Sequence, residues 1–174
     1  MGLHTAIGLA ARGVRVVTTL REPSRSDALR AAAAAAGVRL DIRPLDATDH
    51  RAAADCVEDV LGTYGQVYIL INNAGRGRWD RSSSSRWTAC GLSSRSITGV
   101  AALTKLVLPP MRLAGSGRIV TVTSVGGVVG QPFADAYCAA KFAVERAEAV
   151  AGTGRCAVRY RRVRRRARCG GQRL

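Results

Sequence analysis

Two hydrophobic patterns alternate along the first 145 residues of the chain. In one, apolar residues recur every three or four positions, which predicts helices at 3–12, around 31–36, and at 49–61, 97–113 and 135–150. In the other, short apolar runs rich in β-branched residues predict buried strands at 14–20, 38–45, 67–71 and 117–123. Helices that alternate with such strands are typical of a parallel sheet covered on both faces. We therefore expect an α/β fold with a doubly wound parallel sheet.

Several polar residues refine or interrupt this pattern. Thr48 is the predicted cap of the third helix, and Gly62 its predicted end. Pro109-Pro110 must kink or shorten the helix that starts near residue 97. Residues 76–96 show no clear period, and from Arg146 the composition shifts to Arg, Gly and Cys. We expect an irregular, insert-like segment at 76–96 and a disordered tail at 146–174.

The net charge of +15 comes mainly from these two segments. Residues 146–174 hold ten Arg and one acidic residue, and residues 76–96 hold five Arg and one acidic residue. A basic nucleic-acid-binding protein is therefore one alternative, with phosphate contacts and Tyr160 stacked on a base. A solvated tail accounts for the same cluster, so we expect no specific nucleic-acid partner. The arginines concerned are Arg159, Arg161, Arg162, Arg164, Arg165, Arg166 and Arg168.

Composition also bears on the compartment. No run reaches the roughly 18 apolar residues of a membrane span. The N-terminal residues lack the basic start, apolar stretch and cleavage site of a signal peptide. Five cysteines, an odd number with no C-x-x-C pair, argue against a disulfide framework or a metal site. We expect a cytoplasmic protein without a membrane span and without a bound metal.

Three residues form the strongest candidate for catalysis. Tyr137 and Lys141 are four positions apart on a predicted helix, so they share one face. A tyrosine is a poor base near neutrality, but a nearby ammonium stabilises its phenolate and lets it exchange a proton. Ser124, at the end of a predicted strand, can hydrogen-bond a carbonyl or alcohol oxygen. Together they suit the interconversion of an alcohol and a ketone, with a nicotinamide handling the hydride.

The surrounding sequence resembles the short-chain dehydrogenase/reductase family. Four blocks carry the resemblance: Asn-Asn-Ala-Gly at 72–75, Ser124 thirteen residues before Tyr137, Tyr-x-x-x-Lys at 137–141, and Leu-Asp-Ala-Thr at 45–48. Residues 115–145 look most like the hydroxysteroid and retinol dehydrogenase branch. The resemblance covers roughly residues 2–75 and 97–145, and it implies that residues 1–145 form a partial Rossmann domain binding NAD(P).

The resemblance also implies roles for individual residues. Tyr137 would be the proton donor and acceptor, Lys141 would hold the nicotinamide ribose, and Ser124 would orient the substrate oxygen. The substrate would be a small lipophilic alcohol, ketone or aldehyde, and an intact relative would form a homo-oligomer. The residues expected to bind the cofactor are Gly2, Leu20, Arg21, Asp46, Ala47, Asn73, Ala74, Gly75, Tyr137 and Lys141.

The choice between NADP and NAD depends on the end of the strand at 14–20. An acidic residue there would bind the ribose 2′-hydroxyl of NAD. Here the run ends in Leu20 and Arg21, which suits a 2′-phosphate, so we expect NADP, with NAD still possible. The alternative is that Arg21 merely begins a solvated loop.

The chain departs from the family pattern in three places. Met1-Gly2 matches only the end of the glycine-rich turn, so we expect a first, central strand to be missing between 14–20 and 67–71. Ser96 stands where the family has a catalytic Asn, and the pattern stops after Glu145, before the last strands. A shifted reading frame in both basic segments is our hypothesis, which resequencing tests. A truncated, non-catalytic remnant unable to bind cofactor is the alternative to an enzyme.

Overall fold

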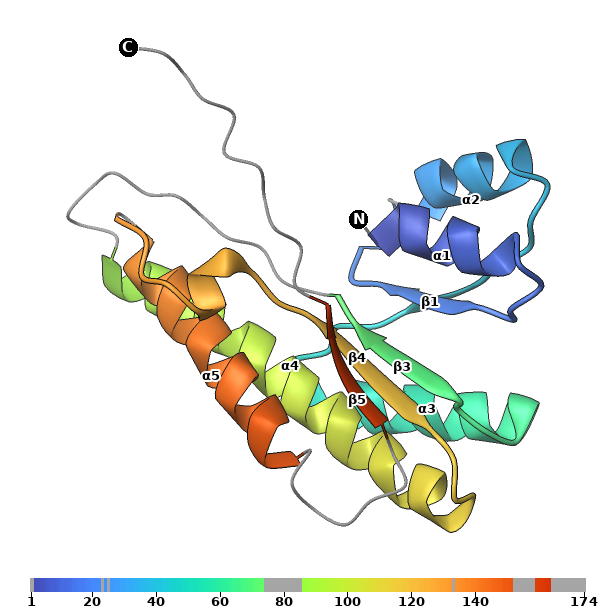
Figure 1. Ribbon diagram of the computed structural model, residues 1–174. Helices are drawn as coiled ribbons and strands as arrows, with labels where there is room; N and C mark the ends of the chain where they lie inside the picture. Colours follow the sequence, from blue (N-terminus) through green and yellow to red (C-terminus); the bar gives the residue numbers. More distant parts are fainter. Residues whose placement is uncertain are drawn as a thin grey trace.

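The structure, a computed structural model, describes the backbone of residues 2–22, 24, 26–73, 86–132, 134–151 and 159–163. Side chains are described over the same ranges except 86–96, 148–151 and 159–163. The helices are α1 (Gly2–Ala10), α2 (Ser26–Ala35), α3 (His50–Tyr64), α4 (Arg86–Leu113) and α5 (Asp135–Ala151), with a 3-10 turn, η2, at Val125–Gly127. The strands are β1 (Val17–Leu20), β2 (Asp41–Pro44), β3 (Ile69–Asn72), β4 (Arg118–Val122) and β5 (Arg159–Val163) (Figure 1).

The strands form two parallel sheets. β1 pairs with β2, and the second sheet has the order β3-β4-β5. Val17 lies opposite Asp41 in the first sheet, and Ile69 lies opposite Arg118 in the second. The predicted α/β architecture with parallel strands is confirmed.

In the described part of the chain, β1 is an edge strand of the first sheet and β3 an edge strand of the second. Among the described residues, β1 pairs only with β2, and β3 pairs only with β4. No residue of β1 is buried, whereas Ile119 of β4, a strand paired on both sides, is fully buried. No strand among the described residues pairs with both β1 and β3, the place where we expect a central strand to be missing.

The core lies between α4 and the β3-β4-β5 sheet. Val107 and Met111 of α4 and Ile119 of β4 are at most 1% exposed, and residues of α3, β3 and the preceding loop pack against them. Gly117 allows this approach, because a Cβ there would lie 2.6 Å from the Met111 side chain. α3 and α4 therefore cover the sheet that carries Ser124.

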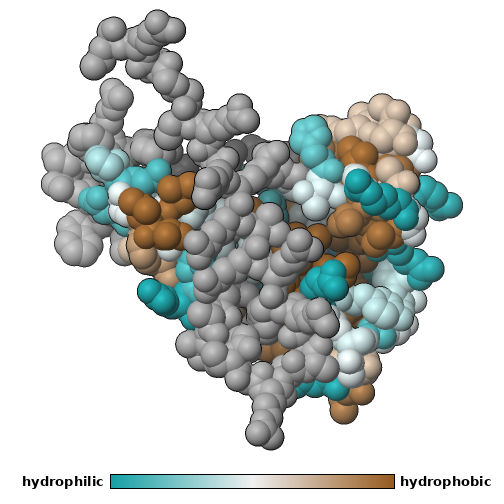
Figure 2. Space-filling view, in the orientation of Figure 1, coloured by the Kyte–Doolittle hydropathy of each residue, from teal (hydrophilic) through white to brown (hydrophobic). Residues whose placement is uncertain are grey.

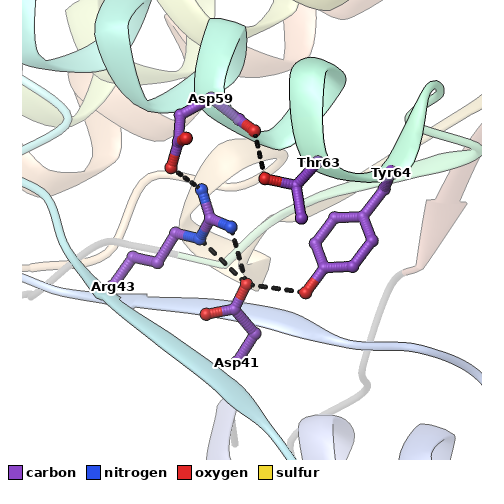
Figure 3. A network of polar contacts seen from close by, with 5 residues as sticks. All are labelled: Asp41, Arg43, Asp59, Thr63 and Tyr64. Carbon is purple, nitrogen blue, oxygen red and sulfur yellow. Dashed lines mark hydrogen bonds and ion pairs between the residues drawn. The ribbon is translucent and has the colours of Figure 1, made fainter.

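A network of hydrogen bonds and ion pairs connects β2 to α3 (Figure 3). Arg43 bonds Asp41 through Nε at 2.9 Å and also pairs with Asp59. Tyr64 donates its hydroxyl to the same Asp41 carboxylate at 3.0 Å, and Thr63 Oγ1 donates to the Asp59 carbonyl at 2.7 Å. The hydrogen bond from Arg43 is the main cause that lowers the pKa of Asp41. β2 is therefore held to the end of α3 by charge-assisted bonds as well as by packing.

The ends of α3 differ by a few residues from the expectation. Asp49, not Thr48, is the N-cap, since its carboxylate accepts hydrogen bonds from the backbone N–H of Arg51 and Ala52. Thr48 instead donates its hydroxyl to Asp46. The helix runs through Gly62 and ends at Tyr64, where Gly65 adopts a φ of 76° that favours glycine.

Three other expectations need correction. α4 begins at Arg86, so the segment 76–96 is not irregular throughout, and residues 76–85 lie outside the described range. α4 also continues through both prolines to Leu113, so they do not shorten the helix. Finally, α5 runs to Ala151, and Arg159–Val163 form β5 along the open edge of β4 instead of a disordered tail. β5 was not predicted because strands were recognised in the sequence by their apolar runs, and backbone hydrogen bonds between strands do not require such a run.

No helix in the described residues has the length and apolar character needed to cross a membrane.

Candidate active site

The predicted site residues gather at the carboxyl ends of the parallel strands. Leu20 ends β1, Asp46 follows β2 by two residues, Asn73 follows β3, and Ser124 follows β4 by two residues. In open parallel α/β sheets this edge is where ligands bind. Ala74 and Gly75, which we also expected in the cofactor site, lie outside the described residues.

Ser124 is held in a defined orientation. It has an extended backbone and is the N-cap of η2, and its Oγ accepts the N–H of Gly126 at 3.3 Å. Because the oxygen is the acceptor in this bond, the hydroxyl hydrogen remains for donation to another oxygen. Ser124 can therefore act as a donor toward a bound substrate.

Tyr137 and Lys141 lie one turn apart at the start of α5. Lys141 Nζ lies 6.0 Å from the centroid of the Tyr137 ring and donates to the carbonyl of Val122 at 3.2 Å. Lys141 is only 9% exposed, and this burial lowers the pKa of its ammonium. The bond to Val122 ties α5 to the end of β4, the strand that leads to Ser124. The three predicted catalytic residues thus lie at the N-cap of η2 and on α5, two elements that contact each other.

Gly2 and Asn73 meet at the open edge of β3. A Cβ at Gly2 would lie 2.8 Å from Asn73 Nδ2, so no larger residue fits there without a shift. Gly2 is the first residue of α1, and the backbone N–H groups of a first helical turn favour negative charge. This close approach brings the start of α1 to the carboxyl end of β3.

A second group of predicted cofactor residues lies beyond β1 and β2. Arg21 Nε pairs with Asp46 Oδ2 at 3.3 Å, and the Arg21 side chain is 63% exposed. Asp46 also accepts hydrogen bonds from the backbone and hydroxyl of Thr48, which fixes the turn after β2. Ala47 in this turn packs against α4, because a Cβ at Gly99 would lie 3.0 Å from Ala47 Cβ. Leu20 is half-buried, and its carbonyl accepts the N–H of Leu45.

The structure reveals residues that the sequence reasoning missed. Asn72 is buried, with its amide nitrogen 3.4 Å from both Thr104 Oγ1 and Thr121 Oγ1, so it cross-links α4, β3 and β4. Gly126 and Gly127 in η2 are buried against α5. The sequence carries no signal for them, because their role depends on how closely the turn approaches α5. Ser96 belongs to α4, but its side chain lies outside the described ones.

Exposed valines follow Ser124 on the same loop. Val125, Val128 and Val129 are 39%, 44% and 57% exposed. Apolar surface on the left of Figure 2 lies at the same end of the molecule as this loop and the start of α5 in Figure 1. Exposed apolar side chains therefore lie on the loop between Ser124 and the start of α5.

A family model and several known proteins match this chain. The family model described as short chain dehydrogenase matches residues 1–163. Estradiol 17-beta-dehydrogenase 1 of Rattus norvegicus is 36% identical over 155 residues, covering 83% of this chain and 44% of the relative. Retinol dehydrogenase 8 of Homo sapiens is 34% identical over 150 residues, covering 83% and 47%. The chain thus spans about half the length of these relatives.

Solved structures show the same fold. A metagenomic short-chain oxidoreductase in complex with NADP superposes with a TM-score of 0.85 at 25% identity, covering 95% of this chain and 77% of the other. A short-chain dehydrogenase from Streptomyces avermitilis superposes with a TM-score of 0.77 at 32% identity, covering 93% and 60%. With a family model matched over nearly its whole length, the chain belongs to the short-chain dehydrogenase/reductase family, among relatives that include hydroxysteroid and retinol dehydrogenases.

Proposed function

We propose that the chain is an NADP-dependent oxidoreductase that interconverts an alcohol and a ketone or aldehyde on a small lipophilic substrate. The observation that supports this proposal is the position of Lys141, which lies 6.0 Å from the centroid of the Tyr137 ring and donates to the carbonyl of Val122, two residues before Ser124. The arrangement offers a hydroxyl donor and a proton-exchanging phenol beside a buried ammonium. Such a set fits reduction of a carbonyl and its reversal.

The chain's own residues would handle the oxygen and the proton. In the reductive direction Ser124 donates a hydrogen bond to the carbonyl oxygen, and Tyr137 transfers its phenolic proton to that oxygen. The Lys141 ammonium stabilises the phenolate that this leaves. In the oxidative direction the same phenolate accepts the alcohol proton. When bound, the nicotinamide supplies or accepts the hydride at the adjoining carbon.

The residues present fit a dinucleotide. The missing side chain at Gly2 leaves the start of α1 close against Asn73, where a backbone can approach a pyrophosphate. Lys141 would hold the nicotinamide ribose, and Asp46 and Ala47 would border the adenine. Arg21 would pair with the 2′-phosphate of NADP, since Leu20 offers no acid for a 2′-hydroxyl. A solved relative whose structure contains NADP supports the same choice.

The substrate class is inferred from the surface beside the polar groups. Val125, Val128 and Val129 would contact the apolar body of a substrate whose oxygen reaches Ser124 and Tyr137. The names of two relatives, an estradiol dehydrogenase and a retinol dehydrogenase, point to lipophilic alcohols as well. We place the reaction in the cytoplasm, as expected from the cysteine content.

Titration with NADPH and a single variant test the proposal. NADPH fluorescence should change on binding, and the protein should oxidise NADPH with a hydrophobic ketone such as a cyclic aliphatic ketone. Tyr137→Phe should lower kcat at least about 100-fold while NADPH still binds, because only the transferable proton is lost. Tyr68→Phe is the matched control, since Tyr68 is 65% exposed and lies at the opposite end of β3. Absence of NADPH binding would favour the non-catalytic remnant instead.

A further inference from the structure

Two consecutive glycines join the turn after Ser124 to the helix that carries Tyr137 and Lys141. Gly126 and Gly127 are both buried, and η2, to which they belong, packs against α5. Neither has a φ in the left-handed region. Their lack of a side chain is therefore required by space and not by backbone conformation.

Gly126 lies against the Tyr137 ring. A Cβ at this position would lie 3.2 Å from Tyr137 Cε1, and equally close to Cys138 Sγ and Gln131 Oε1. Contacts this short require a shift of a few tenths of an ångström. The position of the tyrosine ring relative to the turn is therefore set by the absence of this one carbon.

Gly127 lies against the backbone of α5. A Cβ here would lie 3.0 Å from the Lys141 carbonyl oxygen and 3.1 Å from Glu145 Cγ. A carbonyl within a helix cannot move aside as a flexible side chain can, because it belongs to the hydrogen-bonded ladder of α5. A side chain at residue 127 would thus move the turn away from the helix.

Gly126 also orients Ser124. Its N–H donates to Ser124 Oγ at 3.3 Å, so the residue that touches the Tyr137 ring also holds the serine hydroxyl. A displaced turn would change both relationships at once. Gly130, later in the same loop, lacks this role, because a Cβ added there would meet no atom within 4 Å.

We propose that Gly126 and Gly127 are positioning residues that set the depth at which Ser124 faces Tyr137 and Lys141. This inference rests on the proposed oxidoreductase function, in which Ser124 and Tyr137 act on the same substrate oxygen. Misplacement of a reacting group by about 1 Å can cost about 100-fold in rate. A shift of a few tenths of an ångström is therefore expected to lower the rate without preventing cofactor binding.

The kinetic test compares Gly126→Ala and Gly127→Ala with Gly130→Ala. We expect kcat for ketone reduction to fall about tenfold in the first two variants and to stay unchanged in the third, with NADPH affinity preserved in Gly126→Ala. A double-mutant cycle then combines Gly126→Ala with Ser124→Ala. If Gly126 acts through the serine, its substitution has little further effect once that hydroxyl is gone. Full additivity of the two losses, or a kcat for Gly126→Ala equal to that of the unchanged protein, would overturn the inference.

A second measurement does not depend on catalysis. Tyrosines labelled with ¹³C at Cζ give one NMR signal each, and the signal lost in Tyr137→Phe belongs to Tyr137. Gly126→Ala should shift that signal, whereas Gly130→Ala should leave it in place. An inactive protein that still shows this shift would refute the proposed function and keep the positioning role. An unmoved Tyr137 signal in folded Gly126→Ala would refute the positioning role alone. If Gly127→Ala does not fold, Gly126→Ala by itself still tests the positioning role.

Discussion

Lys141 combines burial, a fixed backbone partner and proximity to Tyr137. Its Nζ reaches Val122 and lies over the Tyr137 ring, and the side chain is 9% exposed. A buried ammonium in low dielectric acts more strongly on a neighbouring phenolate than one in water. In the proposed function the site therefore depends on this one cation, although the protein carries many arginines.

Replacement of Lys141 by Met should remove this charge while preserving the length of the side chain. We expect kcat to fall about 100-fold or more and NADPH to bind more weakly, because both the phenolate and the ribose lose their partner. Lys105→Met is the control, since Lys105 is the other lysine of the chain and is exposed on α4. Steady-state kinetics and fluorescence titration measure the two effects. Equal losses in both variants would show that net charge, and not position, is responsible.

We propose that the preference for NADP depends on Arg21. Arg21→Ala should weaken NADPH binding about tenfold and leave NADH binding nearly unchanged, because a charge-assisted bond to the 2′-phosphate is lost. Arg39→Ala removes the same charge from another exposed position. Dissociation constants for both nucleotides test the prediction, and an equal effect on NADH would assign Arg21 to general attraction only.

At the residue scale, the sequence was sufficient to propose the catalytic side chains. It was not sufficient to identify the residues that close packing requires. Ser124, Tyr137 and Lys141 could be proposed as catalytic residues because their types and spacing match the family pattern. Gly126 and Gly127 could not, because their role depends on how closely a turn approaches α5. The cap of α3 was misplaced by one residue for a similar reason. Thr48 and Asp49 can both cap a helix, and only the contact between Thr48 and Asp46 decides between them.

At the scale of elements, the Asp41 network shows how β2 and α3 depend on pH. The pKa of Asp41 is lowered from 3.8 by Arg43 and Tyr64, so the folded state favours the carboxylate more than the unfolded state does. The resulting stability is fully present above the unfolded pKa and is lost as the pH falls through the lower folded pKa.

Asp41→Asn should therefore destabilise the protein by about 1.5 kcal/mol near neutral pH, the scale of a hydrogen bond to a charged group. The difference from the unchanged protein should begin to shrink as the pH falls below about 4, where the carboxyl of the unfolded state becomes protonated, and it should vanish as the pH falls through the lower folded pKa. Urea denaturation between pH 3 and 7 measures the free energy of unfolding. A difference that is constant across this range would show that the Asp41 charge contributes nothing. Asp55→Asn, on the exposed face of α3, is the control.

Elements were predictable where hydrophobic periodicity was present. β3 and α5 matched their apolar patterns within about two residues. The first turns of α4 and all of β5 were not foreseen, because their arginines and serines give no period. β5 forms along β4 through backbone hydrogen bonds, which carry no signature in side-chain type.

At the scale of the whole molecule, the division into two sheets should appear in local stability. Amides of β1 and β2 should exchange with deuterium faster than amides of β4, because β1 has one open edge and no buried residue. Hydrogen exchange followed by mass spectrometry resolves segments of this size. Equal protection in β1 and β4 would mean that the two sheets open as one unit.

The open edges of β1 and β3 have a further consequence for how the protein interacts with other chains. In the described residues, each edge offers a row of backbone donors and acceptors, and such rows template the addition of another extended chain. Anything that binds the folded form in this way raises its apparent stability with concentration. The melting temperature of this protein should therefore rise with its own concentration, or with an extended apolar peptide, more than that of a domain whose sheet is continuous.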